Sequence, residues 1–403
     1  MKLYIDFYSA TPKSPLQKYN GGGKNVRIMV EQISDMNIPD LEIVLFCPEW
    51  YEVSEETEPV FCNRKNILFE RTKYMTSDYL YEEGSIIFNP VLCLYRDFKE
   101  IIRIKKKNPN SKVCAKVHDL RVIDYVFDYT EKYFFSGIKK LIFPVAKLVY
   151  EGVIPQIIYK PIIRRCLTTL DEVYTASNFS MQHILRISPE TNVKWHYQPI
   201  IFDESKVVTQ RDKAEKEYIL FVSGGRRLKN VGHAMLGFAK YKKKNPDSKL
   251  KLIITGLDEN RFENLCKLKG VSDLAAEESI IRYGYVENDE LEHLYQNCRF
   301  VLYMSKLEGF GLPVLEAASY GKTCVASNAT SIPEVLASAV RYASPLDDDG
   351  IARQISYLCD DDNLRRYEER VISSLAFLRK RMDVEQRSFL EDVLDMSCIN
   401  FLG

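Results

Sequence analysis

The sequence predicts an α/β fold built around two parallel sheets, and three observations lead there. Short apolar runs rich in β-branched residues recur along the chain, and longer amphipathic stretches separate them. This alternation is typical of strands joined by crossover helices, which build parallel sheets. A length of 403 residues is also more than one hydrophobic core usually organises. We therefore expect two Rossmann-like domains.

In the first half, a strand is predicted wherever a short apolar run precedes helical or loop sequence. The runs are Leu3 to Phe7, Glu42 to Cys47, Ser85 to Phe88, Lys112 to Val117 and Glu172 to Thr175. The stretch 203–216 is polar and charged and has no periodic apolar positions, which is typical of a linker. We place the first domain at residues 1–205.

The second half repeats the pattern with a fresh series of strands and helices. Strands are predicted at Tyr218 to Val222, Lys251 to Thr255, Ser279 to Arg282, Phe300 to Tyr303 and Thr323 to Ala326. Helices are predicted to open near Val231, Asn288, Pro313 and Ile332, and only helices are expected beyond Asp347. The second domain is placed at residues 206–375. Residues 376–403 are expected to form C-terminal helices that pack back toward the first domain.

Composition narrows the class of protein. Hydrophobic residues make up 46% and charged residues 28%, as in soluble globular proteins, and the formal net charge of zero does not favour a nucleic-acid partner. Ten cysteines without a Cys-x-x-Cys pair suggest reduced thiols and a cytoplasmic protein. Asp6 interrupts the first apolar run, where a signal peptide needs an uncharged core, and no run is expected to span a membrane.

One segment, Glu131 to Leu170, departs from this balance. It holds seven Lys or Arg residues against two Glu, interleaved with many apolar side chains. Such a composition is typical of a helix that lies on a membrane surface. Packed helix faces with extended lysine side chains are an equally good interpretation.

The segment Glu308-Gly-Phe-Gly-Leu312 carries the clearest chemical signal. It follows a predicted strand and precedes Pro313, a residue favoured at the start of a helix. Unpaired N–H groups at a helix N-terminus suit a diphosphate without any metal. Glu316 falls one turn into this apolar helix, where its carboxylate would need hydrogen-bonding partners. Taken alone, the pattern also fits an acidic residue stabilised by the helix dipole.

These residues resemble the retaining glycosyltransferases of family 4, whose signature is two glutamates around a Gly-Phe-Gly-Leu-Pro core. Glu308 and Glu316 have the family spacing, with seven residues between them. The similarity continues through Arg282 to Val286, Glu290 to Tyr295, Gly321 and Ser331 to Val335, and it runs from about Tyr218 to the C-terminus. The resemblance implies the GT-B fold, in which two Rossmann-like domains face each other across a cleft.

The resemblance also implies a nucleotide-sugar site in the second domain. Glu316 would hold the ribose, and Glu308 would contact the transferred sugar. The other residues expected to bind the donor here are Tyr285, Val286, Phe310, Gly311 and Leu312, the last three through their backbone amides.

The family uses an arginine and a lysine after the first strand of this domain to neutralise the diphosphate. Lys229 matches the lysine, and we prefer Arg226 to its neighbour Arg227 as the arginine. Fixed cations lower the barrier because negative charge grows on the leaving diphosphate. Solvated surface charges are the alternative interpretation.

The first domain matches the family more weakly, through a glycine triplet and one histidine. Gly22 and Gly23 resemble a glycine loop that faces the donor phosphates, although a plain flexible turn explains them equally well. His118 opens a His-Asp-Leu segment at the end of a predicted strand, and the family's histidine approaches the donor sugar. A structural histidine in the core is the alternative.

Together these features predict retaining transfer of a mannose-, rhamnose- or glucose-type hexose from a nucleotide-diphosphate sugar. The acceptor would be a glycan or lipid-linked oligosaccharide in cell-surface polysaccharide synthesis, such as lipopolysaccharide or capsule. The expected catalytic residues are His118, Arg226, Lys229 and Glu308. No cofactor or metal is expected, because the five histidines stand apart in the sequence. The expected location is cytoplasmic, with residues 131–170 touching the inner face of the membrane.

Three other functions remain open at this stage. A glycosidase would also need two acids, which Glu308 and Glu316 could supply. A sugar-nucleotide epimerase on the GT-B fold, or a non-catalytic nucleotide-sugar-binding protein, would keep the same donor site. The presence of His118, Lys229 and Glu308 together favours transfer, while the donor and the acceptor stay unassigned.

Overall fold

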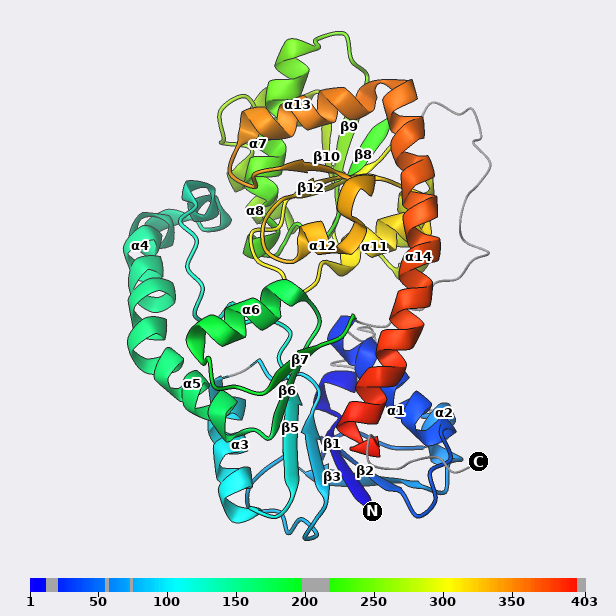
Figure 1. Cartoon of the computed structure of the whole chain (residues 1–403). Coiled ribbons are helices and arrows are strands. Elements are labelled where there is room, and N and C mark those ends of the chain that lie inside the picture. The colour runs from blue at the N-terminus through cyan, green and yellow to red at the C-terminus, as the bar shows by residue number, and fades with distance from the viewer. Residues whose placement is uncertain (12–20, 55–57, 73–74, 94, 198–216, 397–403) are drawn as a thin grey trace. The chain divides into compact units, whose positions relative to one another are not determined.

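A computed structural model describes residues 1–11, 21–54, 58–72, 75–93, 95–197 and 217–396 (Figure 1). The chain forms two compact units. The first comprises Met1–Ile123, Ile154–Ile200 and Lys380–Gly403, and the second comprises Asp124–Val153 and Ile201–Arg379. The predicted linker, 203–216, lies outside the described residues.

The first unit is built on a seven-stranded parallel sheet of order β3-β2-β1-β4-β5-β6-β7. Its strands are β1 (Lys2–Asp6), β2 (Glu42–Pro48), β3 (Ile67–Thr72), β4 (Ile86–Asn89), β5 (Lys112–Lys116), β6 (Glu172–Thr175) and β7 (Val193–Trp195). The five predicted strands are confirmed within one residue. The two edge strands, β3 and β7, were missed because β3 is half polar and β7 has only three residues.

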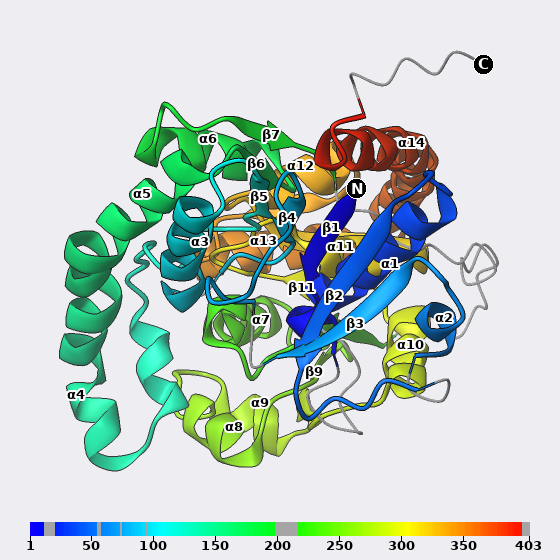
Figure 2. The ribbon, with the colours of Figure 1, turned by 90° about the horizontal axis from the view of Figure 1, so that it is seen from below.

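Helices cover both faces of this sheet, as Figure 2 shows. They are α1 (Gly21–Asp35), α2 (Pro59–Cys62), α3 (Tyr95–Lys107), α5 (Lys160–Thr169), α6 (Asn178–Ile187), the short η1 (Tyr8–Ala10) and the end of α14 (Asp361–Val393). Successive side chains of a strand point to opposite faces. Leu3 and Ile5 therefore pack with α1 and α14, whereas Tyr4 joins the core formed with α3, α5 and α6.

The second unit has a six-stranded parallel sheet of order β10-β9-β8-β11-β12-β13. Its strands are β8 (Tyr218–Phe221), β9 (Lys251–Ile254), β10 (Ile280–Arg282), β11 (Val301–Tyr303), β12 (Cys324–Ser327) and β13 (Arg341–Ala343). The five predicted strands are confirmed within one residue. The edge strand β13 was missed, because its three residues carry little pattern.

The helices of the second unit also agree with the sequence pattern. They are η6 (Arg227–Lys229), α7 (Val231–Lys244), α8 (Glu259–Leu265), α9 (Ser272–Ala276), α10 (Asn288–Asn297), α11 (Leu312–Ser319), α12 (Ile332–Leu336), η7 (Ala337–Ala339), α13 (Asp348–Cys359) and the start of α14. Three of the predicted helix starts, at Val231, Asn288 and Ile332, are confirmed to the residue, and the fourth is displaced by one. Only helices follow Asp347 up to Asp395, as predicted.

Residues 124–153, which we call the arm, pack with the second unit although the predicted first domain contained them. The arm consists of η2 (Tyr129–Phe134), α4 (Gly137–Lys147) and the π-helical turns η3 (Leu148–Val153). Phe134 anchors it in the core of this unit.

The helix that begins at α4 runs on through η4 (Pro155–Tyr159) and α5 as one helix, Gly137–Thr169. By length and composition it could cross a membrane. The expectation that no run spans a membrane stays a prediction, although this helix meets the criterion of length and composition. Between Leu141 and Ile158 only Lys147 and Glu151 are charged, so few charges interrupt a mainly apolar helix.

Candidate active site

The strand order of the second unit reverses between β8 and β11, which lie side by side at the centre of the sheet. Ligands of doubly wound folds bind at such a reversal, outside the carboxyl ends of the strands. The loop after β8 leads to Lys229, and the loop after β11 leads to Glu308. The two loops are tied together because the Lys306 amide donates to the carbonyl oxygen of Leu228 at 2.9 Å.

Glu308 and Lys229 meet directly at this reversal. One carboxylate oxygen of Glu308 accepts hydrogen bonds from Lys229 Nζ at 2.6 Å, from the Tyr303 hydroxyl at 2.7 Å and from the Ser305 hydroxyl at 2.7 Å. Burial by itself raises the pKa of Glu308, but the charge of Lys229 and the three donors outweigh it and leave the pKa below its usual value. Glu308 is therefore ionised at neutral pH.

The backbone of Glu308 is fixed by the loop that follows β12. Its amide donates to the Thr330 hydroxyl at 3.1 Å, and its carbonyl oxygen accepts from the Ser331 hydroxyl at 3.0 Å. Sequence reasoning did not single out Tyr303, Ser305 or Thr330. Tyr303 and Ser305 could have been found, since polar residues at the carboxyl end of a central strand often belong to a site.

The glycine-rich segment leads into α11 as predicted. Gly311 is the N-cap residue and has a φ of 111°, which favours glycine, and Pro313 stands in the first turn of the helix. The first turn of α11 contains no acidic residue, so its positive end is not neutralised from within the helix. The amides of Phe310, Gly311 and Leu312 thus lie where an anionic ligand would be stabilised.

Glu316 is placed differently from the expectation of a buried carboxylate among apolar neighbours. It lies on the exposed side of α11, because the buried neighbours Leu315 and Ala317 occupy the other side of the helix. Its carboxylate accepts a hydrogen bond from Tyr295, at 3.2 Å, and Tyr295 stacks on Tyr320. The carboxylate is therefore both accessible and oriented.

The two neighbouring arginines have different environments. Arg227 forms ion pairs with Glu131 at 2.9 Å and with Glu151 at 2.7 Å, both in the arm. Arg226 is exposed, and no carboxylate of the described residues lies within ion-pair distance of it. Arg226 is thus the less constrained of the two arginines, and its contact with a ligand stays a prediction.

Gly224 and Gly225, in the same loop as the two arginines, allow a close approach of the backbone. A Cβ atom on Gly225 would lie 2.4 Å from the carbonyl oxygen of Gly256, which belongs to the loop after β9.

Tyr285 and Val286 follow β10 at the same edge of the sheet, and Tyr285 is exposed. These positions leave both residues accessible to a ligand.

A buried ionic cluster fastens the arm to the two site loops. Lys306 has no exposed side-chain surface and pairs with Asp128 at 2.6 Å and with Glu131, which in turn accepts from Lys147 at 2.7 Å. His233 donates to Asp348 at 2.7 Å, and its other ring nitrogen lies 3.3 Å from Asp128 without the alignment of a hydrogen bond. The cluster was missed because its members are far apart in sequence.

The charges of this cluster set the pKa of its histidine. Burial lowers the pKa of His233, but Asp128 and Asp348 outweigh it and raise the pKa to about 9. His233 is therefore a cation at neutral pH. Burial raises the pKa of Asp128, but the contacts within this cluster outweigh that effect and hold the pKa far below its usual range.

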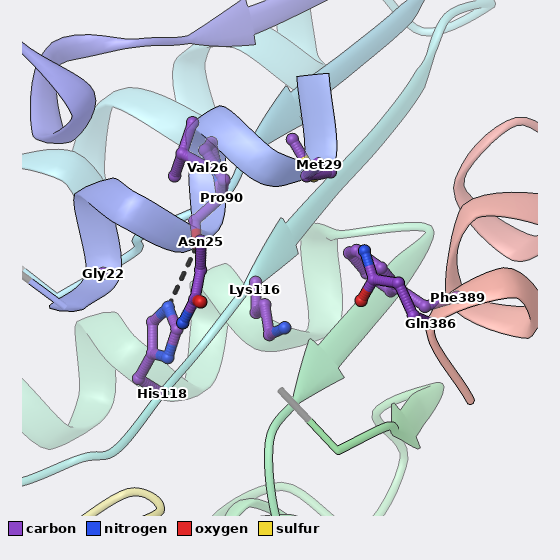
Figure 3. Close-up of a pocket in the computed structure, with 9 residues that line it drawn as sticks. All are labelled: Gly22, Asn25, Val26, Met29, Pro90, Lys116, His118, Gln386 and Phe389. Carbon is purple, nitrogen blue, oxygen red and sulfur yellow. Dashed lines mark hydrogen bonds between the residues drawn. The ribbon is translucent and has the colours of Figure 1, made fainter. Parts of the chain in front are cut away.

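The first unit has a small pocket of its own, in which His118 lies (Figure 3). The pocket is lined by Gly22, Asn25, Val26, Met29, Pro90, Lys116, His118, Gln386 and Phe389. His118 Nε2 lies 3.2 Å from the carbonyl oxygen of Pro90, which can only accept, so this nitrogen carries a proton. Burial and the charge of Lys116 lower the pKa of His118 to about 4, and the ring is neutral at pH 7.

The glycine triplet forms the first turn of α1 rather than a loop. Gly22 lines the pocket beside His118. Gly23 is required for packing, because a Cβ atom there would lie 2.1 Å from the carbonyl oxygen of Ser9. The structure thus brings Gly22 and His118 together in one unit, and Lys229 and Glu308 in the other. That both places serve one ligand stays a prediction.

The site chemistry argues against Glu308 as the general acid of a glycosidase. The acid of such a pair must hold a proton at neutral pH, which requires a raised pKa. The pKa of Glu308 is lowered instead.

Within the described ranges, no group of three or more His, Cys, Asp or Glu side chains could hold a metal ion.

Comparison with known proteins agrees with this geometry. Residues 203–370 match the family described as glycosyl transferases group 1. The O-antigen chain mannosyltransferase B of Escherichia coli is 47% identical over 89 residues, which are 22% of this chain and 23% of that protein. The MMP α-(1→4)-mannosyltransferase of Mycolicibacterium hassiacum is 28% identical over 211 residues, 50% of this chain and 49% of that protein. The chain thus matches half or less of the length of these relatives.

Solved structures resemble the whole chain in fold. The Anabaena protein HepE, in a complex with UDP-glucose, aligns with a TM-score of 0.64 over 99% of this chain and 100% of that one, at 12% identity. With two doubly wound parallel sheets the chain has the GT-B fold, and its segment 203–370 belongs to the glycosyl transferases group 1 family.

Proposed function

We propose that this protein is a retaining hexosyltransferase that moves a sugar from a nucleotide-diphosphate donor to a glycan or lipid-linked oligosaccharide. The observation that carries the proposal is the Lys229–Glu308 pair at the reversal of the second sheet, beside the N-terminus of α11. The mannosyltransferases among the relatives make a mannose donor the first candidate. The role in the cell would be synthesis of a surface polysaccharide, at the inner face of the membrane.

In this proposal Lys229, Arg226 and the positive end of α11 together bind the diphosphate. Lys229 is held by a carboxylate at 2.6 Å, so a diphosphate would compete for a cation that is already in position. Preorganised cations stabilise the charge that grows on the leaving group as the sugar–phosphate bond breaks. The exposed carboxylate of Glu316 would accept hydrogen bonds from the ribose hydroxyls.

Glu308 would orient the transferred sugar through its carboxylate. The three donors at one of its oxygens keep it ionised, which suits hydrogen bonding to sugar hydroxyls and stabilisation of an oxocarbenium-like state. His118 would act as a neutral hydrogen-bonding group toward the sugar, because its pKa lies well below 7. No side chain needs to serve as a general base if the leaving phosphate takes the acceptor proton.

A panel of nucleotide sugars in a thermal-shift assay tests the donor site. GDP-mannose, UDP-glucose and dTDP-rhamnose cover the donor types, and at least one should raise the melting temperature of the wild-type protein. The shift should be lost in Glu316→Ala, whereas Glu290→Ala, an exposed acid on α10, is the matched control. The donor site is wrongly assigned if Glu316→Ala responds like the wild type.

The activity is tested with the donor that binds. The free sugar released by hydrolysis, or the glycosidic bond formed by transfer, should initially keep the anomeric configuration of the donor, as NMR of the anomeric proton can show. Inversion would contradict the proposal. Conversion into an epimeric nucleotide sugar would identify an epimerase, and binding without any turnover, over a broad set of acceptors, would identify a binding protein.

A further inference from the structure

The arm carries an amphipathic helix whose apolar side faces outward. Ile138, Leu141 and Val145 of α4 have 76%, 81% and 69% of their surface exposed. The row continues through Leu148, Val149, Tyr150 and Val153 of η3, which are all exposed. Monomeric soluble proteins rarely expose a contiguous apolar patch of this kind, so the row marks an interaction surface.

The polar side of the same helix faces the protein. Lys147 is buried and pairs with Glu131, and Glu151 pairs with Arg227. Phe143 also contacts Phe135, with the two rings tilted by 31° and their centroids 4.6 Å apart. An ordinary surface helix buries its apolar side and exposes its polar one. The arm does the reverse, which requires an apolar partner on its outer side.

We propose that the outer face of α4 and η3 lies in the surface layer of an anionic lipid bilayer. The face consists mainly of aliphatic side chains. Of the Trp, Tyr and Arg residues that concentrate binding energy in protein interfaces, it contains Tyr150 alone. Lys139 is exposed among these side chains, and its neighbour Lys140 is partly exposed. An apolar stripe flanked by cations matches a bilayer surface with anionic headgroups.

The helix lies along the bilayer surface and does not cross it, although it has the length to do so. A spanning helix would have lipid around its full circumference. The buried pair of Lys147 with Glu131 and the partly exposed pair of Arg227 with Glu151 occupy one side of this helix. Exposing these charges to hydrocarbon would be costly, so only the outer side is available to lipid.

The inference deepens the proposed function. Only the purpose of the lipid contact rests on that function: the protein would reach a lipid-linked acceptor from the membrane surface. The arm that carries the apolar face also pairs with Lys306, two residues before Glu308. The proposed lipid surface is therefore connected to a donor-site loop through contacts within one unit.

Vesicle flotation of the purified chain at low salt tests this surface. The vesicles contain phosphatidylcholine alone or phosphatidylcholine with about one third phosphatidylglycerol. We expect the wild type to float with the anionic vesicles, and Leu141→Glu/Val145→Glu to bind at least tenfold less. The matched control is Phe377→Glu/Val384→Glu on α14, whose side chains are 67% and 69% exposed, and it should bind like the wild type.

The remaining outcomes show whether the partner of this face is a bilayer or a second copy of the chain, and whether the helix lies on the bilayer or crosses it. The lipid surface is refuted if wild type and arm variant bind vesicles equally, or if neither binds. It is also refuted if the wild type is a dimer that the arm variant dissociates. Resistance to alkaline carbonate extraction would show a spanning helix instead. Nucleotide-sugar binding, measured on the same samples, should be equal in all variants, so failure of the lipid surface and failure of the donor site are distinguished.

Discussion

Replacing Lys116 by Met should stabilise the first unit, because this lysine is buried without a counter-ion. It lies on β5 and lines the same pocket as His118 (Figure 3), and no acceptor among the described residues bonds its ammonium group. Burial lowers the pKa of Lys116 from 10.5 to about 8. At about 1.4 kcal/mol per pKa unit, the charged form costs on the order of 3 kcal/mol at pH 7. The contact of Nζ with the Phe389 ring, at 4.6 Å, offsets about 1 kcal/mol.

The net gain expected for Lys116→Met is therefore about 2 kcal/mol at pH 7, with the apolar part of the side chain retained. The folded pKa is lowered, so the unfolded chain binds more protons between pH 8 and pH 10.5, and the penalty fades as the pH rises through that window. Urea unfolding, with hydrogen exchange of the β4 and β5 amides to assign the transition, measures the difference at pH 7 and pH 10. Lys106→Met on the exposed side of α3 is the control. A loss of stability at pH 7, or a difference independent of pH, would refute the reasoning.

Three further predictions concern the second unit. The raised pKa of His233, about 9, means that its ion pairs contribute stability fully below pH 6.5 and lose it as the pH rises through 9. In urea unfolding, His233→Gln should remove this pH dependence of the free energy of unfolding. An unchanged pH profile would contradict the prediction. Arg226→Ala should weaken nucleotide-sugar binding about tenfold or more in calorimetry, whereas Arg227→Ala should chiefly lower the unfolding temperature. The reverse result would exchange the roles of the two arginines. Tyr303→Phe removes a hydrogen bond to Glu308 and should lower kcat without lowering the unfolding temperature by more than a few degrees. An unaltered kcat would show that this hydroxyl is not needed.

The strands that could be predicted are those whose sequence is apolar on both sides, because both faces of the sheet are covered. β2 and β11 are buried along most of their length and were located from hydrophobicity alone. β3, β7 and β13 are edge strands, with polar positions or only three residues, and their pairing depends on neighbours distant in sequence. Edge strands therefore leave too weak a local pattern.

The site could be predicted as far as its residues belong to short motifs. Glu308 stands in such a motif, and Lys229 follows a strand at a recognisable distance. The cluster around Lys306 could not be predicted, since Asp128 and Glu131 lie more than 170 residues away in sequence. For the arm, composition left a membrane surface and a packed helix as equal alternatives. Only the structure shows that its polar side faces inward.

Calorimetric titration of nucleotide sugars into the wild type and Lys229→Met tests the central claim most directly, with Lys240→Met, an exposed lysine on α7, as control. We expect at least one nucleotide-diphosphate sugar to bind the wild type and the control equally. Binding to Lys229→Met should be at least about 30-fold weaker, since loss of a charge-assisted hydrogen bond costs about 2 kcal/mol or more. Equal binding to Lys229→Met, or no binding of any nucleotide sugar to the wild type, would contradict the account.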